Sequence, residues 1–139
     1  MNGLEWIVEA HGCDPGALAD AEKLRNLFAC MVRDLHLRPV AETQWHQFPA
    51  STSTSVPGGI TGLCLLAESH LACHTFPEHG SLCLNLFCCK PRPAWEFEDY
   101  LRKHFGADSV AIRLLEREYA SESAVAAVGS FTTSARGRS

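Results

Sequence analysis

The sequence predicts an α+β fold, a two-layer sandwich in which helices cover one face of a mainly antiparallel sheet. Segments with the alternating pattern of strands recur along the 139 residues, and two segments have the apolar spacing of a helix. Their order is strand, helix, strand, several strands, helix and strand, and not a regular strand–helix alternation. Residues 1–119 are predicted to form a single domain, and residues 120–139 a disordered, Ser-, Ala- and Gly-rich tail.

The first third of the chain supplies a strand, a helix and a second strand. Residues 4–10 alternate as a strand. Asp14 and Pro15 are typical of a helix start, as N-cap and first helical residue. Apolar residues at helical spacing then predict one helix of about five turns that ends near Pro39. Residues 40–48 alternate well enough to predict the second strand.

The remaining segments are mostly strands. Four strands are predicted, at residues 60–67, 71–76, 81–89 and 110–119. The strand at residues 60–67 is almost continuously apolar, so we expect it inside the sheet. A helix is predicted at residues 94–105, ended by Gly106. The connections are predicted as a polar loop at residues 49–55 and turns at residues 57–59 and 77–80.

Composition limits the classes of function. Hydrophobic residues make up 46% of the chain and the net charge is −4, without the basic face that nucleic-acid binding needs. No apolar run has the length of a membrane span, and the first residues lack the pattern of a signal peptide. The cysteines number seven, an odd count, and several lie in apolar runs. Reduced thiols in the cytoplasm are the simpler interpretation.

The most informative stretch is residues 67–78, which lies between two apolar runs. It contains a hydroxyl, a thiol, two imidazoles and two carboxylates, on Ser69, Cys73, His70, His74, Glu68 and Glu78. Polar groups between buried strands must be paired or functional, because burying them unpaired is costly. The stretch is therefore the predicted functional site.

This stretch also carries a motif. It reads Glu-Ser-His from Glu68 and, three residues later, His-Thr-Phe-Pro-Glu from His74, with Cys89 about fifteen residues beyond His74. It resembles the prokaryotic-type S-adenosylmethionine decarboxylases, a family of self-processing pyruvoyl enzymes that usually have Trp at the position of Phe76. The resemblance covers roughly residues 40 to 119. It implies the same two-layer fold and a homodimer of processed protomers.

The resemblance implies that the cofactor is made from the chain itself. The Ser69 hydroxyl would attack the Glu68 carbonyl, and β-elimination would then cut the chain into residues 1–68 and 69–139. Residue 69 would become a covalent pyruvoyl group, which forms a Schiff base with the substrate and accepts its electrons. His74 would be the processing base, and Cys89 the donor of a proton to the substrate carbon.

Other residues match supporting positions of the family. Thr61 stands where the family has a serine that assists processing. Leu71 and Phe76 fall at positions that bind adenine, and Glu78 at one that binds the ribose. Cys88 competes with Cys89, because neighbouring strand residues face opposite ways. His70 has no predicted role.

Two departures from the family keep alternatives open. Ser55 stands where an aromatic wall of the adenine site is expected, although Phe48 fills this role if residues 49–55 contain an insertion. Asn85 replaces a common acidic residue. The alternatives are a pyruvoyl decarboxylase of arginine or ornithine, and a non-processing homologue that acts by binding.

A metal-binding module is a third alternative. Its candidate ligands are His70, Cys73, His74, His79, Cys88 and Cys89. The chain has no CxxC pair, and strand neighbours point to opposite faces, so we expect no metal site.

Overall fold

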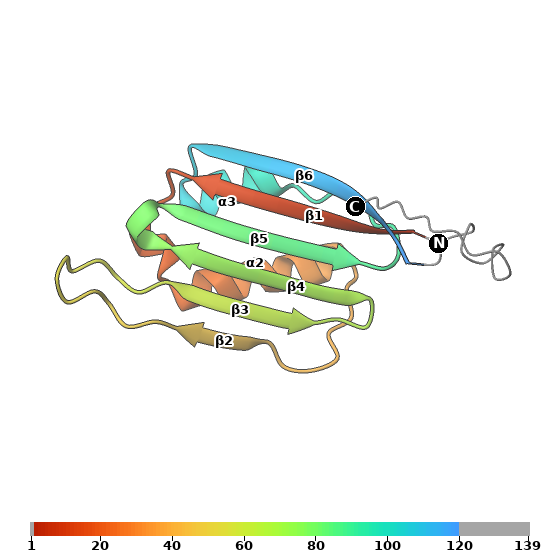
Figure 1. The fold of residues 1–139 in the computed structure, drawn as a ribbon, viewed down its shortest axis with the longest axis horizontal. Coiled ribbons are helices and arrows are strands. Elements are labelled where there is room, and N and C mark those ends of the chain that lie inside the picture. Colours follow the sequence, from red (N-terminus) through yellow and green to blue (C-terminus); the bar gives the residue numbers. More distant parts are fainter. Residues whose placement is uncertain (1, 120–139) are drawn as a thin grey trace, which may run out of the picture.

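The computed structural model describes residues 2–119, which form a six-stranded sheet with helices packed on it (Figure 1). The elements in chain order are β1 (Asn2–His11), α1 (Pro15–Leu18), α2 (Ala21–Asp34), β2 (Gln44–Gln47), β3 (Ile60–Leu65), β4 (Ser69–Phe76), the 3₁₀ helix η1 (Pro77–His79), β5 (Ser81–Cys88), α3 (Phe97–Phe105) and β6 (Ser109–Glu118). No helix of this part of the chain is long and apolar enough to cross a membrane. The predicted disordered tail lies outside the described residues.

Every strand pair in the sheet is antiparallel, which confirms the predicted fold class. The strand order is β2-β3-β4-β5-β1-β6, so the first strand of the chain lies between β5 and β6. The strands from β2 to β5 follow one another as neighbours through short or medium connections. The strand predicted at residues 60–67 is β3, which lies inside the sheet between β2 and β4.

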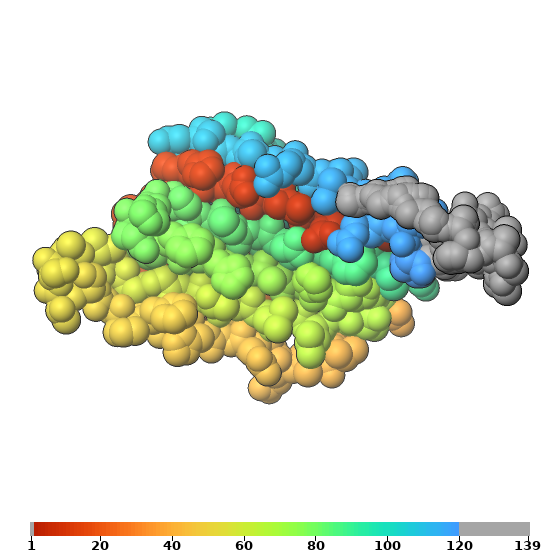
Figure 2. All heavy atoms as spheres, viewed as in Figure 1, coloured from red at the N-terminus to blue at the C-terminus, as the bar shows by residue number. Residues whose placement is uncertain are grey.

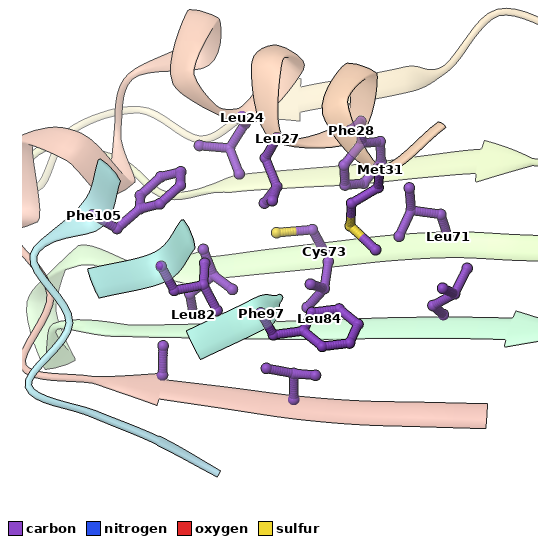
Figure 3. Close-up of a cluster of buried hydrophobic side chains, with 14 of the residues drawn as sticks. Leu24, Leu27, Phe28, Met31, Leu71, Cys73, Leu82, Leu84, Phe97 and Phe105 are labelled. Carbon is purple, nitrogen blue, oxygen red and sulfur yellow. The ribbon is translucent and has the colours of Figure 1, made fainter. Parts of the chain in front are cut away.

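The hydrophobic core lies between one face of the sheet and the helices (Figure 3). Alternate residues of β1 and β5 are buried on this face, in agreement with the predicted pattern. The helices contribute the buried side chains of Leu24, Leu27, Phe28, Met31, Phe97, Leu101 and Phe105. Within residues 2–119 no helix covers the opposite face, which is turned to the viewer in Figures 1 and 2 and is called the open face below.

The single five-turn helix predicted up to Pro39 is wrong. The chain forms α1 and then breaks at Ala19, after which α2 begins with Asp20 as a second N-cap. The Asp20 carboxylate accepts the N–H groups of Glu22 and Lys23 at 3.0 and 3.3 Å. The helix ends at Asp34, and His36 adopts a positive φ of 54° beyond it.

The connection between β2 and β3 also differs from the prediction. β2 has only four residues. Residues 57–59 form neither a turn nor a strand; the chain reverses earlier, where Ser51 donates its N–H to the Val56 carbonyl at 2.9 Å. Gly58 lies so close to the Phe48 carbonyl oxygen that a Cβ atom would approach it to 1.7 Å. This loop projects from one end of the sheet (yellow in Figure 2).

Candidate active site

The predicted cleavage point lies in the tight turn between β3 and β4. Leu66 and Ser69 exchange backbone hydrogen bonds of 3.0 and 3.2 Å, so Ala67 and Glu68 form the corners of the turn. The Ser69 Oγ lies against the carbonyl oxygen of Glu68. The same oxygen accepts the N–H of Cys89 at 2.9 Å. A nucleophile, the carbonyl that it would attack and a donor to the carbonyl oxygen are therefore together.

Glu68 is the one fully buried charged residue of the described chain, with 3% of its surface exposed. Its Oε2 accepts a hydrogen bond from Arg38 Nε at 2.7 Å, and it forms ion pairs with Arg38 Nη2 at 2.5 Å and Arg92 Nη2 at 3.5 Å. Burial alone would raise the pKa of Glu68, but the Arg38 hydrogen bond and the charges of both arginines outweigh it and lower the pKa. Oε1 is buried and lacks a hydrogen-bond partner.

The two neighbouring cysteines lie in different surroundings. Cys88 pairs with Ser69 across the strands, and its side chain is fully buried on the helix side of the sheet. Burial raises the pKa of the Cys88 thiol, an effect that the nearby Arg92 partly offsets. Cys89 lies just beyond β5 and is partly exposed. The backbone of Cys89, rather than its thiol, holds the Glu68 carbonyl.

His74 and Thr61 form a second group at the other end of the same strand. Thr61 Oγ1 lies 3.1 Å from His74 Nδ1, across the β3–β4 pair on the open face. His74 is exposed. Because His74 lies five positions after Ser69 in the same strand, the two side chains face opposite ways and their Cα atoms are ~17 Å apart. One chain therefore does not bring the predicted processing base to the nucleophile.

A cleft of about 450 Å³ opens beside this second group. Its lining comes from the loop between β2 and β3, the start of β3, the end of β4 and η1: Phe48, Pro49, Ser51, Thr54, Val56, Pro57, Gly58, Gly59, Thr61, Thr75, Phe76 and Glu78. Two predicted substrate residues, Phe76 and Glu78, are among them, and so is Phe48, the alternative aromatic wall. The predicted Leu71 is not, because its side chain is fully buried against the helices (Figure 3).

His70 is part of a polar network that crosses the open face. Its Nε2 lies 2.8 Å from Asn85 Oδ1, and Asn85 Nδ2 donates to Glu5 Oε2 at 2.8 Å. Burial acts to raise the pKa of Glu5, but the hydrogen bonds from Asn85 and Arg117 lower it overall. The network fixes the His70 ring next to the cleavage point. It joins β1, β4 and β5, so local sequence gives no sign of it.

The predicted metal ligands do not form a cluster. Among residues 2–119, no three His, Cys, Asp or Glu side chains are grouped so that they could hold a metal ion. Cys73 and Cys88 face the helices, whereas His70 and His74 lie on the open face. The metal alternative therefore has no support in the described part of the chain.

Comparison with known proteins decides the family. The sequence model described as "S-adenosylmethionine decarboxylase" matches residues 4–118 of the chain. The chain belongs to this family. Relatives of this family include the S-adenosylmethionine decarboxylase proenzymes of Pyrococcus abyssi, 31% identical over 83% of this chain and 78% of the relative, and of Prochlorococcus marinus, 34% identical over 85% and 89%.

The fold of the decarboxylase family agrees with this assignment. The crystal structure of the adenosylmethionine decarboxylase from Aquifex aeolicus superposes with a TM-score of 0.69 and 28% sequence identity. The match covers 86% of this chain and 93% of the other. The predicted resemblance, which rested on the motif around Ser69, is thus confirmed over nearly the whole domain.

The decarboxylase motif did not reveal Arg38 and Arg92. Arg92 lies between Pro91 and Pro93 in the connection after β5, and Arg38 precedes Pro39 after α2. These prolines indicate rigid loops, but nothing in the local pattern assigns the arginines a partner. Their common partner, Glu68, is 30 residues from Arg38 in the sequence.

Proposed function

We propose that this chain is a proenzyme that cuts itself between Glu68 and Ser69 and then decarboxylates S-adenosylmethionine, the reaction that makes the aminopropyl donor for spermidine. The observation that carries the proposal is the Ser69 Oγ against the Glu68 carbonyl oxygen, which also accepts the Cys89 N–H. Membership of the family and the word "proenzyme" in the names of relatives support it.

In the first step, the Ser69 oxygen attacks the Glu68 carbonyl carbon. The Cys89 N–H stabilises the negative charge that develops on the carbonyl oxygen. The C–N bond breaks, and an ester replaces the peptide bond. A base then removes the Ser69 α-proton, and the Cβ–O bond breaks. The products are a chain of residues 1–68 and a chain of residues 69–139, whose first residue becomes a pyruvoyl group as hydrolysis releases ammonia.

The pyruvoyl group, once formed, supplies the electron sink that decarboxylation requires. In this proposal Cys89 gives the proton to the substrate carbon. Its partial exposure supports the assignment, whereas the Cys88 thiol is enclosed in the core. In the uncut chain Ser69 is paired with Cys88 across β4 and β5. After cleavage residue 69 is a chain end, so the strand pairing no longer fixes which way it points.

We further propose the cleft beside Thr61 as the site of the adenosyl group. Phe48 and Phe76 are 49% and 38% exposed and can stack on an adenine ring. The Glu78 carboxylate can accept hydrogen bonds from ribose hydroxyls. The volume of about 450 Å³ is within the usual range for small-molecule sites. In this proposal Phe48 supplies the aromatic wall that is missing at position 55, where the chain has Ser55.

A homodimer completes this proposal, because His74 is too far from Ser69 in one chain. We propose that the open faces of two chains pack about a two-fold axis with their strands antiparallel, which brings the Ser69 turn of one chain near the His74 end of the other. The exposed Leu63 and Leu65 on the open face support such a contact. We also propose a cytoplasmic location, which the seven free cysteines support.

The denatured intact mass of the purified protein tests the proposal. The parent chain should give two masses that correspond to cleavage between residues 68 and 69, the second blocked by pyruvoyl. Ser69→Ala should give one uncut, inactive chain, while the matched variant Ser81→Ala should be cut normally. An uncut parent chain, or two chains from Ser69→Ala, would refute self-processing at this bond.

A further inference from the structure

The ion cluster around Glu68 carries one positive charge in excess. Arg38 and Arg92 contribute two positive charges and Glu68 one negative charge, and the lowered pKa keeps Glu68 ionised at neutral pH. The Arg38 side chain is 67% exposed, but only 18% of the Arg92 side chain is exposed, so water screens the Arg92 charge least and a second carboxylate would pair best there. The excess lies next to the one bond that the chain is proposed to cut.

Both arginines are held where they are. The Arg38 carbonyl accepts the N–H of Ala67 at 2.7 Å, so its backbone is tied to the turn itself. Arg92 stands between two prolines, and only 18% of its side chain is exposed. The Arg92 Nε is buried and has no hydrogen-bond partner in the described structure. A buried guanidinium with an unused donor beside Glu68 is arranged to donate a hydrogen bond to another carboxylate oxygen.

We propose that Arg38 and Arg92 form a charge clamp that receives the carboxylate released at Glu68 and so promotes the elimination step of self-cleavage. In that step the Ser69 Cβ–O bond breaks, a base takes the Ser69 α-proton, and a double bond forms between Cα and Cβ. The bonding electrons leave on Glu68 as its α-carboxylate. Two cations then face two carboxylates, and the excess charge is neutralised. The inference rests on the proposed self-processing.

The clamp acts on the second step because only that step leaves a lasting negative charge on Glu68. The first step exchanges an amide for an ester and an amine, and its transient oxyanion faces the Cys89 N–H. The arginines are positioning residues for a leaving group and do not react themselves. Loss of one cation should therefore leave ester formation largely intact and slow the elimination.

Hydroxylamine separates the two steps, because it cleaves an ester and leaves an unblocked Ser69 at the new chain start. In Arg92→Gln we expect ester to accumulate and the elimination to slow by roughly ten- to a hundredfold, the scale of one charged hydrogen bond. Arg92→Lys should restore most of the rate. Arg33→Gln, which loses the exposed ion pair to Asp34, is the control and should process normally. The masses of the denatured chains over time give both rates.

Glu68→Gln distinguishes a charge clamp from a structural ion pair. A clamp with two free cations should eliminate at least as fast as the parent, whereas loss of a structural pair should slow processing as much as Arg92→Gln does. Equal slowing of the two variants would overturn the inference, as would an Arg92→Gln chain that forms no ester or cuts at the parent rate. If Arg92→Gln does not fold, Arg38→Gln replaces it in the test, because the Arg38 side chain is 67% exposed. A parent chain that is never cut would instead refute the proposed function.

Discussion

Cys88 and Cys89 illustrate how much one residue position matters. They are identical in chemistry and adjacent in sequence, so the sequence could not choose between them. The structure gives Cys88 to the core and leaves Cys89 partly exposed at the end of β5. A proton donor has to reach the substrate, and an enclosed thiol with a raised pKa is poorly suited to that role.

The pair of variants Cys88→Ala and Cys89→Ala tests this difference. Cys89→Ala should still be cut, but its kcat should fall by roughly 10²- to 10⁴-fold, the usual contribution of a general acid. Cys88→Ala should retain most of the activity and lose about 1 kcal/mol of unfolding free energy from the core. Steady-state kinetics of the processed proteins gives the comparison. The reverse order of kcat losses would assign the proton donor to Cys88.

At the scale of elements, the break between α1 and α2 shows that an N-cap residue can interrupt a helix within a regular apolar stripe. The stripe continues from Leu18 to Leu35, but Asp20 uses its carboxylate to satisfy the first N–H groups of α2. A capped new start is more favourable here than an unbroken helix. Asp20 is an N-cap residue type that the sequence shows, but the regular apolar spacing on both sides of it predicts an unbroken helix.

Asp20→Ala should therefore destabilise α2 and, with it, the layer that covers the sheet. We expect a loss of about 1 kcal/mol of unfolding free energy, the usual value of an N-cap. Urea unfolding of the uncut Ser69→Ala chain, at one fixed protein concentration, measures it without the complication of two chains. Asp20→Asn keeps a capping oxygen and should lose much less. An equal loss in both variants would mean that the charge, and not the cap, is responsible.

At the scale of the whole molecule, β4 divides the polar stretch between two ends of the sheet. The Ser69 turn lies at one end, and the connections that hold the cleft lie at the other (Figure 1). A strand is rigid and extended, so residues five apart cannot meet. We therefore expect a second chain to supply the base that one chain cannot bring to Ser69.

Mixed dimers test this assembly. His74→Ala alone should remain uncut, but co-expression with Ser69→Ala should cut up to half of its chains, because the Ser69→Ala chain lends its intact His74. The double variant Ser69→Ala/His74→Ala has no base to lend and is the control partner. Tagged chains and intact mass identify which chain is cut. A His74→Ala chain that is cut alone, or never in the mixture, would contradict a shared site.

The sequence by itself determined the fold class, most strand positions and the motif from Glu68 to Glu78. These follow from short-range rules: alternation, helical spacing and turn residues depend on neighbours in the chain. Only the tertiary structure decided that Leu71 belongs to the core and that Arg38 and Arg92 meet at Glu68. Those facts depend on which strands and loops become neighbours in space, and a local pattern carries no record of such contacts.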